Sequence, residues 1–526
     1  MDYTPVTAVW EITMGCNMRC AHCGSSCAEP LPDELTTEEA LKVCDDMKTL
    51  GMKWITLSGG EPLLRKDWPL LAGRLYRNGI IPNIITNGWL VTEKMVKTAE
   101  ENGVETISVS LDGIQPTHDK IRKKGSYNKV IQALQILKAC RHVSGVNTTV
   151  TKQNIGQLDA LKQILIENGV DLWQLQIGLP MGNLKNNRDS IIDPADVDYL
   201  LDYAYRTTME GRIKVFPADC LGYFTGNESI VRQISTGSPT PVLWQGCNAG
   251  KRSFGLLHNG DVLGCTSIRE RSLIEGNIRE RSLVDIWNDP ERFSWSRNLR
   301  KQDLSGDCKE CCYGEVCLGG CPNTRLTVNG SIYSNNDYCS YHAALEKTRE
   351  KLAKYDDVAE LMGIARTYVD SQKWQQAALT LNRVVQIDSE NVDALALLGY
   401  VQFNLGNFDA SKEANEQILL KDPNNAYAQK GHGLALHRLG RSQEGIDSLK
   451  RSVSLSSLDN MDAYFDLAVV YRDIGQKQDA LDILREAEKK QPGFLNRAGD
   501  FYNQLLMEIG FSPAAPSNLY RFSRPF

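Results

Sequence analysis

CNMRCAHC, residues 16–23, follows a short β-like run and places three cysteines at intervals of four and three residues. A fourth cysteine, Cys27, comes soon after it in GSSC. Three thiolates this close in one loop suit zinc or an iron–sulfur cluster. Structural zinc takes four ligands, which Cys27 would complete, whereas three cysteines on a [4Fe–4S] cluster leave one iron open to a substrate or cofactor. Both interpretations stay open on these residues alone.

The segment around that loop, from residue 7 to about 210, alternates β-like runs with amphipathic helical patterns. The six β-like runs are TAVWEIT, WITLSGG, IPNIITNG, TISVSLDG, VNTTVT and DLWQLQIGLP. Several of the helical patterns between them begin near Thr, Asp or Asn and end at Gly, as capped helices do. Six βα units in a row predict a parallel sheet, either an open doubly wound sheet or a curved partial barrel.

Short polar motifs follow four of these runs. GCNMRC comes after the first run, SGGEP after the second, TNG after the third and SLDG after the fourth. Functional groups collect at the C-terminal ends of parallel strands in both kinds of sheet. We therefore expect these four motifs to meet at one site.

Length, charge and cysteine content limit the classes of function. A chain of 526 residues predicts two to four domains, and a formal net charge of −6 argues against a protein held on nucleic acid by a general positive field. The N-terminus lacks a basic region before an apolar run, and no stretch of about 18 apolar residues occurs. We expect a cytoplasmic protein without a membrane span. Fifteen cysteines in such a chain indicate metal binding or catalysis rather than disulfides.

A second group of cysteines lies between residues 235 and 345, where the βα rhythm stops and glycine and polar turns prevail. Its spacing is Cys247, Gly260-x4-Cys265, Cys308-x2-Cys311-x5-Cys317-x3-Cys321 and Cys339. A loop-rich segment with few apolar runs needs another source of stability, which metal clusters would supply. Zinc knuckles are the alternative to iron–sulfur clusters here.

A third pattern, with a period of about 34 residues, covers residues 357–493. Small residues recur at Ala365, Gly399, Gly433 and Ala468, and turn glycines at Gly406, Gly440 and Gly475. The first copy has Gln372 where glycine is expected. This helix–turn–helix pattern resembles the tetratricopeptide repeat in about four copies, and residues 494–526 are expected to add a capping helix and a flexible tail.

The N-terminal part resembles the radical S-adenosylmethionine (SAM) enzymes, whose signature is C-x3-C-x2-C after the first strand of a βα array. By this resemblance Cys16, Cys20 and Cys23 bind a [4Fe–4S] cluster, and the amino and carboxylate groups of SAM chelate the fourth iron. Reduction then cleaves SAM to methionine and a 5′-deoxyadenosyl radical. The residues that the resemblance places around SAM are Gly59, Gly60, Glu61, Pro62, Asn87, Ser110, Asp112 and Arg122.

The second cysteine group resembles the seven-cysteine SPASM extension of radical SAM enzymes that modify peptides. The resemblance implies two auxiliary [4Fe–4S] clusters, and so three clusters in all. One would be held by a four-cysteine set, Cys308, Cys311, Cys317 and Cys339. The other would be held by a three-cysteine set, Cys247, Cys265 and Cys321, whose fourth ligand the sequence does not identify. Cys312 is expected to be a bystander, and Cys220 is a candidate hydrogen-atom donor to a substrate radical.

Together these resemblances predict the architecture of the chain. Residues 1–234 are expected to form an α/β partial (βα)6 barrel of the TIM type. Residues 235–345 would form a small loop-rich iron–sulfur domain, and residues 357–493 an all-α tetratricopeptide solenoid.

Three kinds of substrate are compatible with the resemblance. The first is a ribosomally made peptide that is cross-linked, oxidised or epimerised, the second a sulfatase-type protein, and the third a small molecule or cofactor. Sulfatase-type relatives carry an aspartate base after the second SPASM cysteine, where this chain has Thr266. A threonine hydroxyl is no base at neutral pH, which disfavours that class.

The repeats favour a polypeptide among these substrates. Tetratricopeptide stacks form grooves that hold peptide segments, and a small metabolite would not need one. The alternative is a scaffold that only dimerises or docks the enzyme. The resemblance further implies a reductant such as flavodoxin or ferredoxin as a partner.

Overall fold

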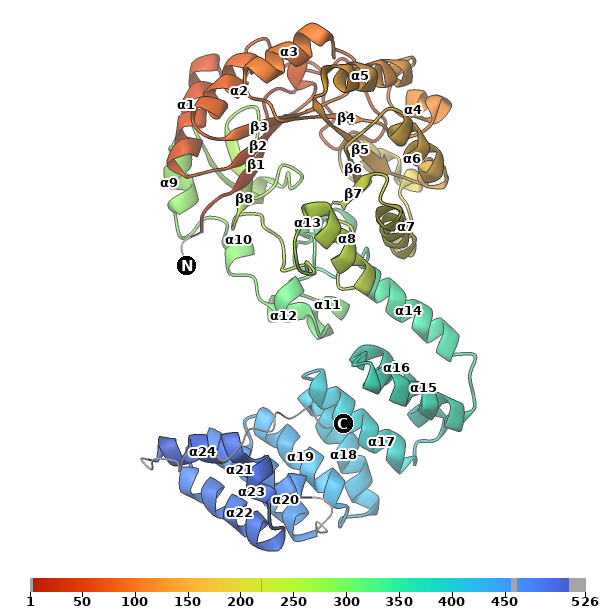
Figure 1. Ribbon diagram of the computed structural model, residues 1–526, viewed down its shortest axis with the longest axis vertical. Coiled ribbons are helices and arrows are strands. Elements are labelled where there is room, and N and C mark those ends of the chain that lie inside the picture. Colours follow the sequence, from red (N-terminus) through yellow and green to blue (C-terminus); the bar gives the residue numbers. More distant parts are fainter. Residues whose placement is uncertain (1–2, 219, 456–460, 510–526) are drawn as a thin grey trace. The chain divides into compact units, whose positions relative to one another are not determined.

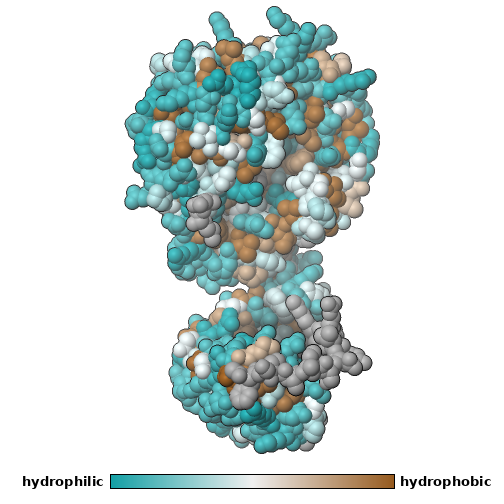
Figure 2. Space-filling model, turned by 60° about the vertical axis from the view of Figure 1, so that its left-hand side comes forward, coloured by the Kyte–Doolittle hydropathy of each residue, from teal (hydrophilic) through white to brown (hydrophobic). Residues whose placement is uncertain are grey.

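The computed structural model describes residues 3–218, 220–455 and 461–509. The chain divides into two compact units, Met1–Ala344 and Leu345–Phe526. No helix in the described ranges is long and apolar enough to cross a membrane. On the face shown in Figure 2, hydrophilic side chains predominate and apolar ones are interspersed among them.

The first unit is built on one ten-stranded sheet (Figure 1) of order β10-β9-β8-β1-β2-β3-β4-β5-β6-β7. The strands are β1 Thr7–Glu11, β2 Trp54–Ser58, β3 Ile81–Thr86, β4 Thr106–Ser110, β5 Val143–Val150, β6 Leu172–Ile177, β7 Lys214–Pro217, β8 Ser253–Leu256, β9 Asp261–Leu263 and β10 Ile274–Asn277. Strands β1 to β7 are parallel, and β8 joins the other side of β1, also in parallel. Among the described strands β7 and β10 form the two edges and do not pair, so the sheet is open.

All six predicted strands form, as β1 to β6, and the prediction of six βα units missed a seventh strand. Strand β7 has only four residues and ends in proline, which lacks an N–H and is tolerated at the edge of a sheet. A run this short gives no alternating pattern, which is why the sequence did not reveal it. The antiparallel β9 and β10 extend the opposite edge.

Helices α1 to α6 cover the outer face of the curved sheet (Figure 1). The helices from α1 to α8 are α1 Thr37–Thr49, α2 Trp68–Arg77, α3 Glu93–Glu101, α4 Gln115–Ile121, α5 Ser126–Cys140, α6 Leu158–Glu167, α7 Asp196–Glu210 and α8 Gly226–Thr236. The first shows why the sequence begins a helix there, because Thr36 accepts from the Glu39 N–H while the Glu39 carboxylate accepts from the Thr36 N–H. That capping box ends the loop that carries the first cysteines.

The auxiliary segment, residues 235–344, is short of regular structure, as its composition predicts. Its helices are α9 Leu283–Asn288, α10 Ser294–Arg297, α11 Asp307–Glu310, α12 Gly314–Cys317 and α13 Pro322–Asn329, and α14 Ser340–Leu352 leads out of it.

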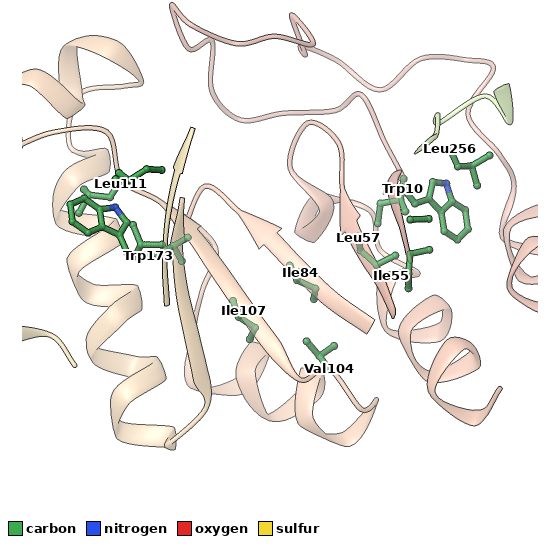
Figure 3. Close-up of a cluster of buried hydrophobic side chains, with 14 of the residues drawn as sticks. Trp10, Ile55, Leu57, Ile84, Val104, Ile107, Leu111, Trp173 and Leu256 are labelled. Carbon is green, nitrogen blue, oxygen red and sulfur yellow. The ribbon is translucent and has the colours of Figure 1, made fainter. Parts of the chain in front are cut away.

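One hydrophobic core joins this segment to the N-terminal part. Trp10 of β1 lies in register with Leu256 of β8, and both are fully buried (Figure 3). The predicted boundary at residue 234 therefore runs through a single compact unit.

Four helix pairs form the repeat unit, with the predicted small residues buried where helices pack. The pairs are α15 Val358–Asp370 with α16 Trp374–Ile387, α17 Val392–Asn404 with α18 Phe408–Lys421, α19 Ala426–Arg438 with α20 Ser442–Leu455, and α21 Asp462–Asp473 with α22 Lys477–Lys490. A Cβ atom at Gly433 would lie 2.7 Å from the carbonyl oxygen of Gly445, so only glycine permits this approach of α19 to α20. The predicted capping helix forms as α23 Phe494–Arg497 and α24 Gly499–Glu508, and the predicted tail lies outside the described residues.

Gln372 adopts the left-handed backbone conformation that glycine takes in the other three repeats. Its φ is 54°, against 79° at Gly406, 81° at Gly440 and 84° at Gly475. A residue with a side chain costs about 1–2 kcal/mol in this conformation, and glycine avoids that cost. Part of the gain is offset because glycine makes the unfolded chain more flexible. We expect Gln372→Gly to stabilise the first repeat by about 0.5–1 kcal/mol, measured as slower amide hydrogen exchange in α15 and α16. Gly406→Gln should speed exchange in α17 and α18, and equal exchange in both variants and the parent would contradict this.

Candidate active site

A cavity of about 1080 Å³ opens at the C-terminal ends of the parallel strands. Most of the predicted site residues line it: Cys16, Cys20, Cys23, Gly59, Gly60, Asn87, Ser110, Arg122, Cys220, Cys265 and Cys321. The four strand-end motifs and two cysteines of the auxiliary segment thus meet at one place. The remaining predicted residues lie behind its wall or at a second, smaller pocket.

The first cysteine set, Cys16, Cys20 and Cys23, lies on the loop between β1 and α1. Backbone hydrogen bonds hold this loop, from the Cys16 N–H to the Ala28 carbonyl at 2.7 Å and from the Ala21 N–H to the Ile121 carbonyl at 2.8 Å. Burial raises the pKa of Cys20 to about 11 and also raises the pKa of Cys16. These thiols therefore need a positively charged partner to become thiolates, and iron is such a partner.

Gly59 and Gly60 make room for the cysteine loop itself. A Cβ atom on Gly59 would lie 2.3 Å from the Thr13 carbonyl oxygen, and one on Gly60 would lie 2.3 Å from the Gly15 carbonyl oxygen. The Gly60 N–H donates to Thr13 at 2.8 Å, and the Glu61 N–H donates to Gly15 at 2.8 Å. The glycines that we expected to face SAM thus also clamp the loop onto the end of β2.

Glu61 is placed differently from our expectation that it faces the ammonium group of SAM. Its side chain is fully buried and does not line the cavity. The carboxylate accepts hydrogen bonds from Thr86 Oγ1 at 2.8 Å, the Asn87 N–H at 2.8 Å and the Leu63 N–H at 3.2 Å. Burial raises its pKa to about 7. Glu61 joins the ends of β2 and β3, and Pro62, also buried, opens the turn that follows.

Asp112 is likewise fully buried behind the wall, in contrast to the expected SAM contact. Its carboxylate accepts from His22 Nε2 at 2.9 Å, from the Thr149 N–H at 2.9 Å and from Arg122 Nε. Burial acts to raise the pKa of Asp112, but the charges of Arg122 and His22 outweigh it and hold the pKa well below its usual range. Asp112 is a positioning group for residues that do line the cavity.

Arg122 extends this network to the first cysteine set. Its Nη1 lies 4.0 Å from the Cys20 Sγ, while its Nε is held by Asp112. The guanidinium therefore places a positive charge beside a predicted cluster ligand, where it stabilises the thiolate.

Several residues of the site escaped the sequence prediction. His22 lies inside the CAHC motif and Asn17 beside Cys16, where Asn17 Oδ1 accepts from Asn87 Nδ2 at 2.6 Å. Their place within the motif was the available signal.

Another group, formed by Glu11, Ser25 and Arg269, had no such signal. Arg269 donates to Glu11 and, at 2.6 Å, to Ser25 Oγ, and all three line the cavity. These contacts tie the auxiliary segment to β1 and the cysteine loop over sequence distances of more than 240 residues.

The four-cysteine set converges on a second pocket, of about 20 Å³. Cys308, Cys311, Cys317 and Cys339 all line it, and all are buried. Of the three-cysteine set, Cys265 and Cys321 line the large cavity, and Cys247 packs with Cys265 against a small apolar cluster. The four-cysteine set thus lies at a different pocket from Cys265 and Cys321.

The surroundings of the cysteines suit an iron–sulfur cluster. Within the described ranges, no three His, Cys, Asp or Glu side chains are already grouped around a single point. Buried cysteines around a pocket, with an arginine beside one of them, fit the ligand chemistry of an iron–sulfur cluster.

Comparison with known families agrees with this geometry. Residues 10–164 match the model of the radical SAM superfamily, and residues 247–312 match that of the SPASM iron–sulfur cluster-binding domain. Residues 342–433 and 431–493 match tetratricopeptide repeat models. The chain therefore carries a radical SAM domain, a SPASM domain and tetratricopeptide repeats in that order, and the first two imply SAM and iron–sulfur clusters as cofactors.

Within that class, the curated relatives act on different substrates. An AdoMet-dependent heme synthase of Methanosarcina barkeri is 29% identical over 351 residues, which cover 65% of this chain and 98% of that protein. A mycofactocin maturase of Mycolicibacterium smegmatis is 26% identical over 354 residues, covering 66% and 86%. Among solved structures, Streptococcus suis SuiB bound to precursor peptide SuiA aligns with a TM-score of 0.51 at 18% identity, over 64% of this chain and 75% of that one. The last likeness is one of fold.

Proposed function

We propose that this protein is a cytoplasmic radical SAM enzyme that abstracts a hydrogen atom from a polypeptide and oxidises or cross-links it. The observation that carries the proposal is that one cavity is lined by the first cysteine set and by Cys265 and Cys321 of the auxiliary segment. A substrate bound there would lie between the first cysteine set, where the radical would form, and the auxiliary cysteines, whose cluster would accept an electron from the substrate. The repeat unit adds a surface of the kind that binds polypeptides.

The cofactors would be SAM and three [4Fe–4S] clusters, with a reductant such as flavodoxin or ferredoxin. Cys16, Cys20 and Cys23 would hold the cluster that supplies the electron for reductive cleavage of SAM, and this chemistry would provide the radical that takes a hydrogen atom from the substrate. The chain's own part is to fix the cysteine loop, through the backbone contacts at Gly59 and Gly60 and through the bond from His22 to Asp112. Loss of a second electron and a proton from the substrate radical completes an oxidation by two hydrogen atoms.

Cys220 lines the same cavity and is half-buried. If the reaction is an epimerisation instead, the substrate radical must regain a hydrogen atom, and the Cys220 thiol is the donor that we propose. The thiyl radical left on Cys220 would then need one electron and one proton from the external reductant and solvent to restore the thiol.

A carboxylate-bearing tetrapyrrole is the second candidate substrate, because curated relatives are heme synthases and because arginines predominate in the cavity wall. Among the described lining residues, the charged ones are Arg122, Arg232, Arg252, Arg269 and Glu11. Three of these arginines already pair with Asp112, Glu228 and Glu11. That engagement is why we place this candidate second. A sulfatase-type reaction is disfavoured because Thr266 lines the cavity directly after Cys265.

The test supplies both substrates to the anaerobically reconstituted full chain. A peptide encoded beside this gene and iron–coproporphyrin III are incubated separately with SAM and reductant, and analysed by mass spectrometry. Loss of two hydrogen atoms from the peptide supports the proposal, whereas an unchanged mass with a D-residue would support the epimerisation with Cys220 as the donor in its place. A change in the mass of the tetrapyrrole, with an untouched peptide, overturns the proposal in favour of the second candidate.

The repeat surface gives a separate prediction. Tyr400 on α17 and Tyr427 on α19 each remain 39% exposed. We expect the double change Tyr400→Ala and Tyr427→Ala to weaken binding of the substrate peptide about tenfold or more, as loss of exposed aromatic anchors does. Uncoupled SAM cleavage should be unchanged, and equal peptide affinity would assign the repeats another role.

A further inference from the structure

Arg325 is a buried arginine of the auxiliary segment. It lies on α13, four residues after Cys321, and only 1% of it is exposed. Its Nε and Nη1 atoms are buried and make no hydrogen bond. Among the described residues no carboxylate forms an ion pair with it, whereas buried Arg122 is held by Asp112.

Such an arrangement is costly unless a negative group lies nearby. An isolated charge in a protein interior costs several kcal/mol, and buried charges are normally paired. Burial accordingly lowers the pKa of Arg325, and the groups that oppose this are Cys308, Cys321, Cys247 and Tyr223. Three of these four are predicted cluster ligands, and they come from both auxiliary sets.

The backbone between Cys317 of one set and Cys321 of the other leaves room for the Arg325 side chain. In CLGGC, a Cβ atom on Gly319 would lie 2.8 Å from Arg325 Nη1, and one on Gly320 would lie 2.7 Å from the ring of Tyr223. Both glycines have positive φ, 74° and 64°. The Tyr223 hydroxyl in turn accepts from the Cys321 N–H at 3.0 Å. The two glycines between Cys317 and Cys321 therefore leave room for the Arg325 guanidinium and the Tyr223 ring.

We propose that Arg325 is a counter-ion shared by the two auxiliary cysteine sets, a positioning residue that stabilises their iron-bound state and raises its reduction potential. The proposal rests on the proposed function, in that both sets hold iron–sulfur clusters. A cluster with thiolate ligands is anionic and gains one further negative charge on reduction. A fixed positive charge nearby favours the reduced form more than the oxidised one. Acting on both sets, one arginine eases the arrival of an electron at either.

The test compares Arg325→Met, which keeps the bulk and removes the charge, with Arg325→Lys, which keeps the charge. Both are made in a chain whose Cys16, Cys20 and Cys23 are alanine, so that only auxiliary iron is observed. Iron per chain is measured after anaerobic reconstitution, and the potential is measured by a redox titration followed by electron paramagnetic resonance. Arg297→Met is the matched control, because Arg297 packs on the rings of Tyr3, Trp287 and Phe293 in the same unit.

We expect Arg325→Met to lower the auxiliary potential, or to lose auxiliary iron, while Arg325→Lys and Arg297→Met stay close to the parent. Equal behaviour of the methionine and lysine variants at position 325 overturns the proposal, whether both match the parent, both lose iron or both fail to fold. If the parent itself binds no auxiliary iron, the cluster assignment of the proposed function fails first. If the Arg325→Met variant holds auxiliary iron at an unchanged potential, the counter-ion proposal is overturned while the cluster assignment of the proposed function stands.

Discussion

Replacement of Cys20 by alanine abolishes the formation of 5′-deoxyadenosine from SAM. Cys20 is the most buried member of the first cysteine set, and Arg122 lies beside its sulfur. With two cysteines left, the cluster loses an anchor and the loop no longer directs an open iron toward the cavity. We expect the reconstituted variant to hold about four fewer iron atoms per chain, the content of one [4Fe–4S] cluster, and to release no 5′-deoxyadenosine above the enzyme-free background.

Cys140→Ala is the matched control for that variant. Cys140 ends α5, is partly buried and does not line the cavity. Its iron content and SAM cleavage should equal those of the parent. Retained SAM cleavage in Cys20→Ala would show that another residue, with Cys27 the nearest candidate, completes the ligand set.

Asp112→Asn destabilises the first unit by about 3–5 kcal/mol, as loss of one partner from a buried ion pair does. The change leaves the buried Arg122 guanidinium without its carboxylate and removes the acceptor of His22 Nε2. Because the pKa of Asp112 lies well below its usual range, its contribution is present above about pH 4 and should stay constant from there to neutral pH. Urea unfolding of the full chain, followed by tryptophan fluorescence, measures the change.

Asp45→Asn provides the comparison, because Asp45 receives two hydrogen bonds from Arg74 at a surface where both side chains are over 40% exposed. A surface ion pair of this kind contributes about 1 kcal/mol or less. The double variant Asp112→Asn with Arg122→Gln should recover part of the loss, since it removes the unpaired charge. Similar effects of Asp112→Asn and Asp45→Asn would mean that Arg122 finds another partner.

Local patterns in the sequence were enough to predict the order of the elements. The six short β-like runs became β1 to β6, and the 34-residue period identified four helix pairs, because both signals can be read from the order of residues along the chain. The motifs at the strand ends met in one cavity because parallel strands end on the same edge of a sheet. Strand β7 was missed because four residues carry no period.

Side-chain orientation was harder to predict than position. Glu61 and Asp112 stand next to residues that line the cavity, yet both turn into the protein, toward Thr86 and Arg122. Successive side chains of a strand point to opposite faces of the sheet, and the conformation of the following loop decides where its own side chains point. A motif alone therefore does not show which of its residues faces the ligand. Arg269 binds groups more than 240 residues away in the sequence, and nothing adjacent to it signals this contact.

The pairing of β8 with β1 has a consequence for the history and engineering of this chain. Without β8, the N–H and C=O groups along one side of β1 would be unpaired, and an open edge of this kind recruits other chains. A truncated N-terminal region should therefore aggregate rather than fold as a free domain. Exchange of auxiliary segments between homologues would have to preserve the SFGL strand, residues 253–256, and its alignment with Thr7–Trp10. The auxiliary segment therefore has a second role, because its strand β8 completes the hydrogen bonding of β1 within the same chain.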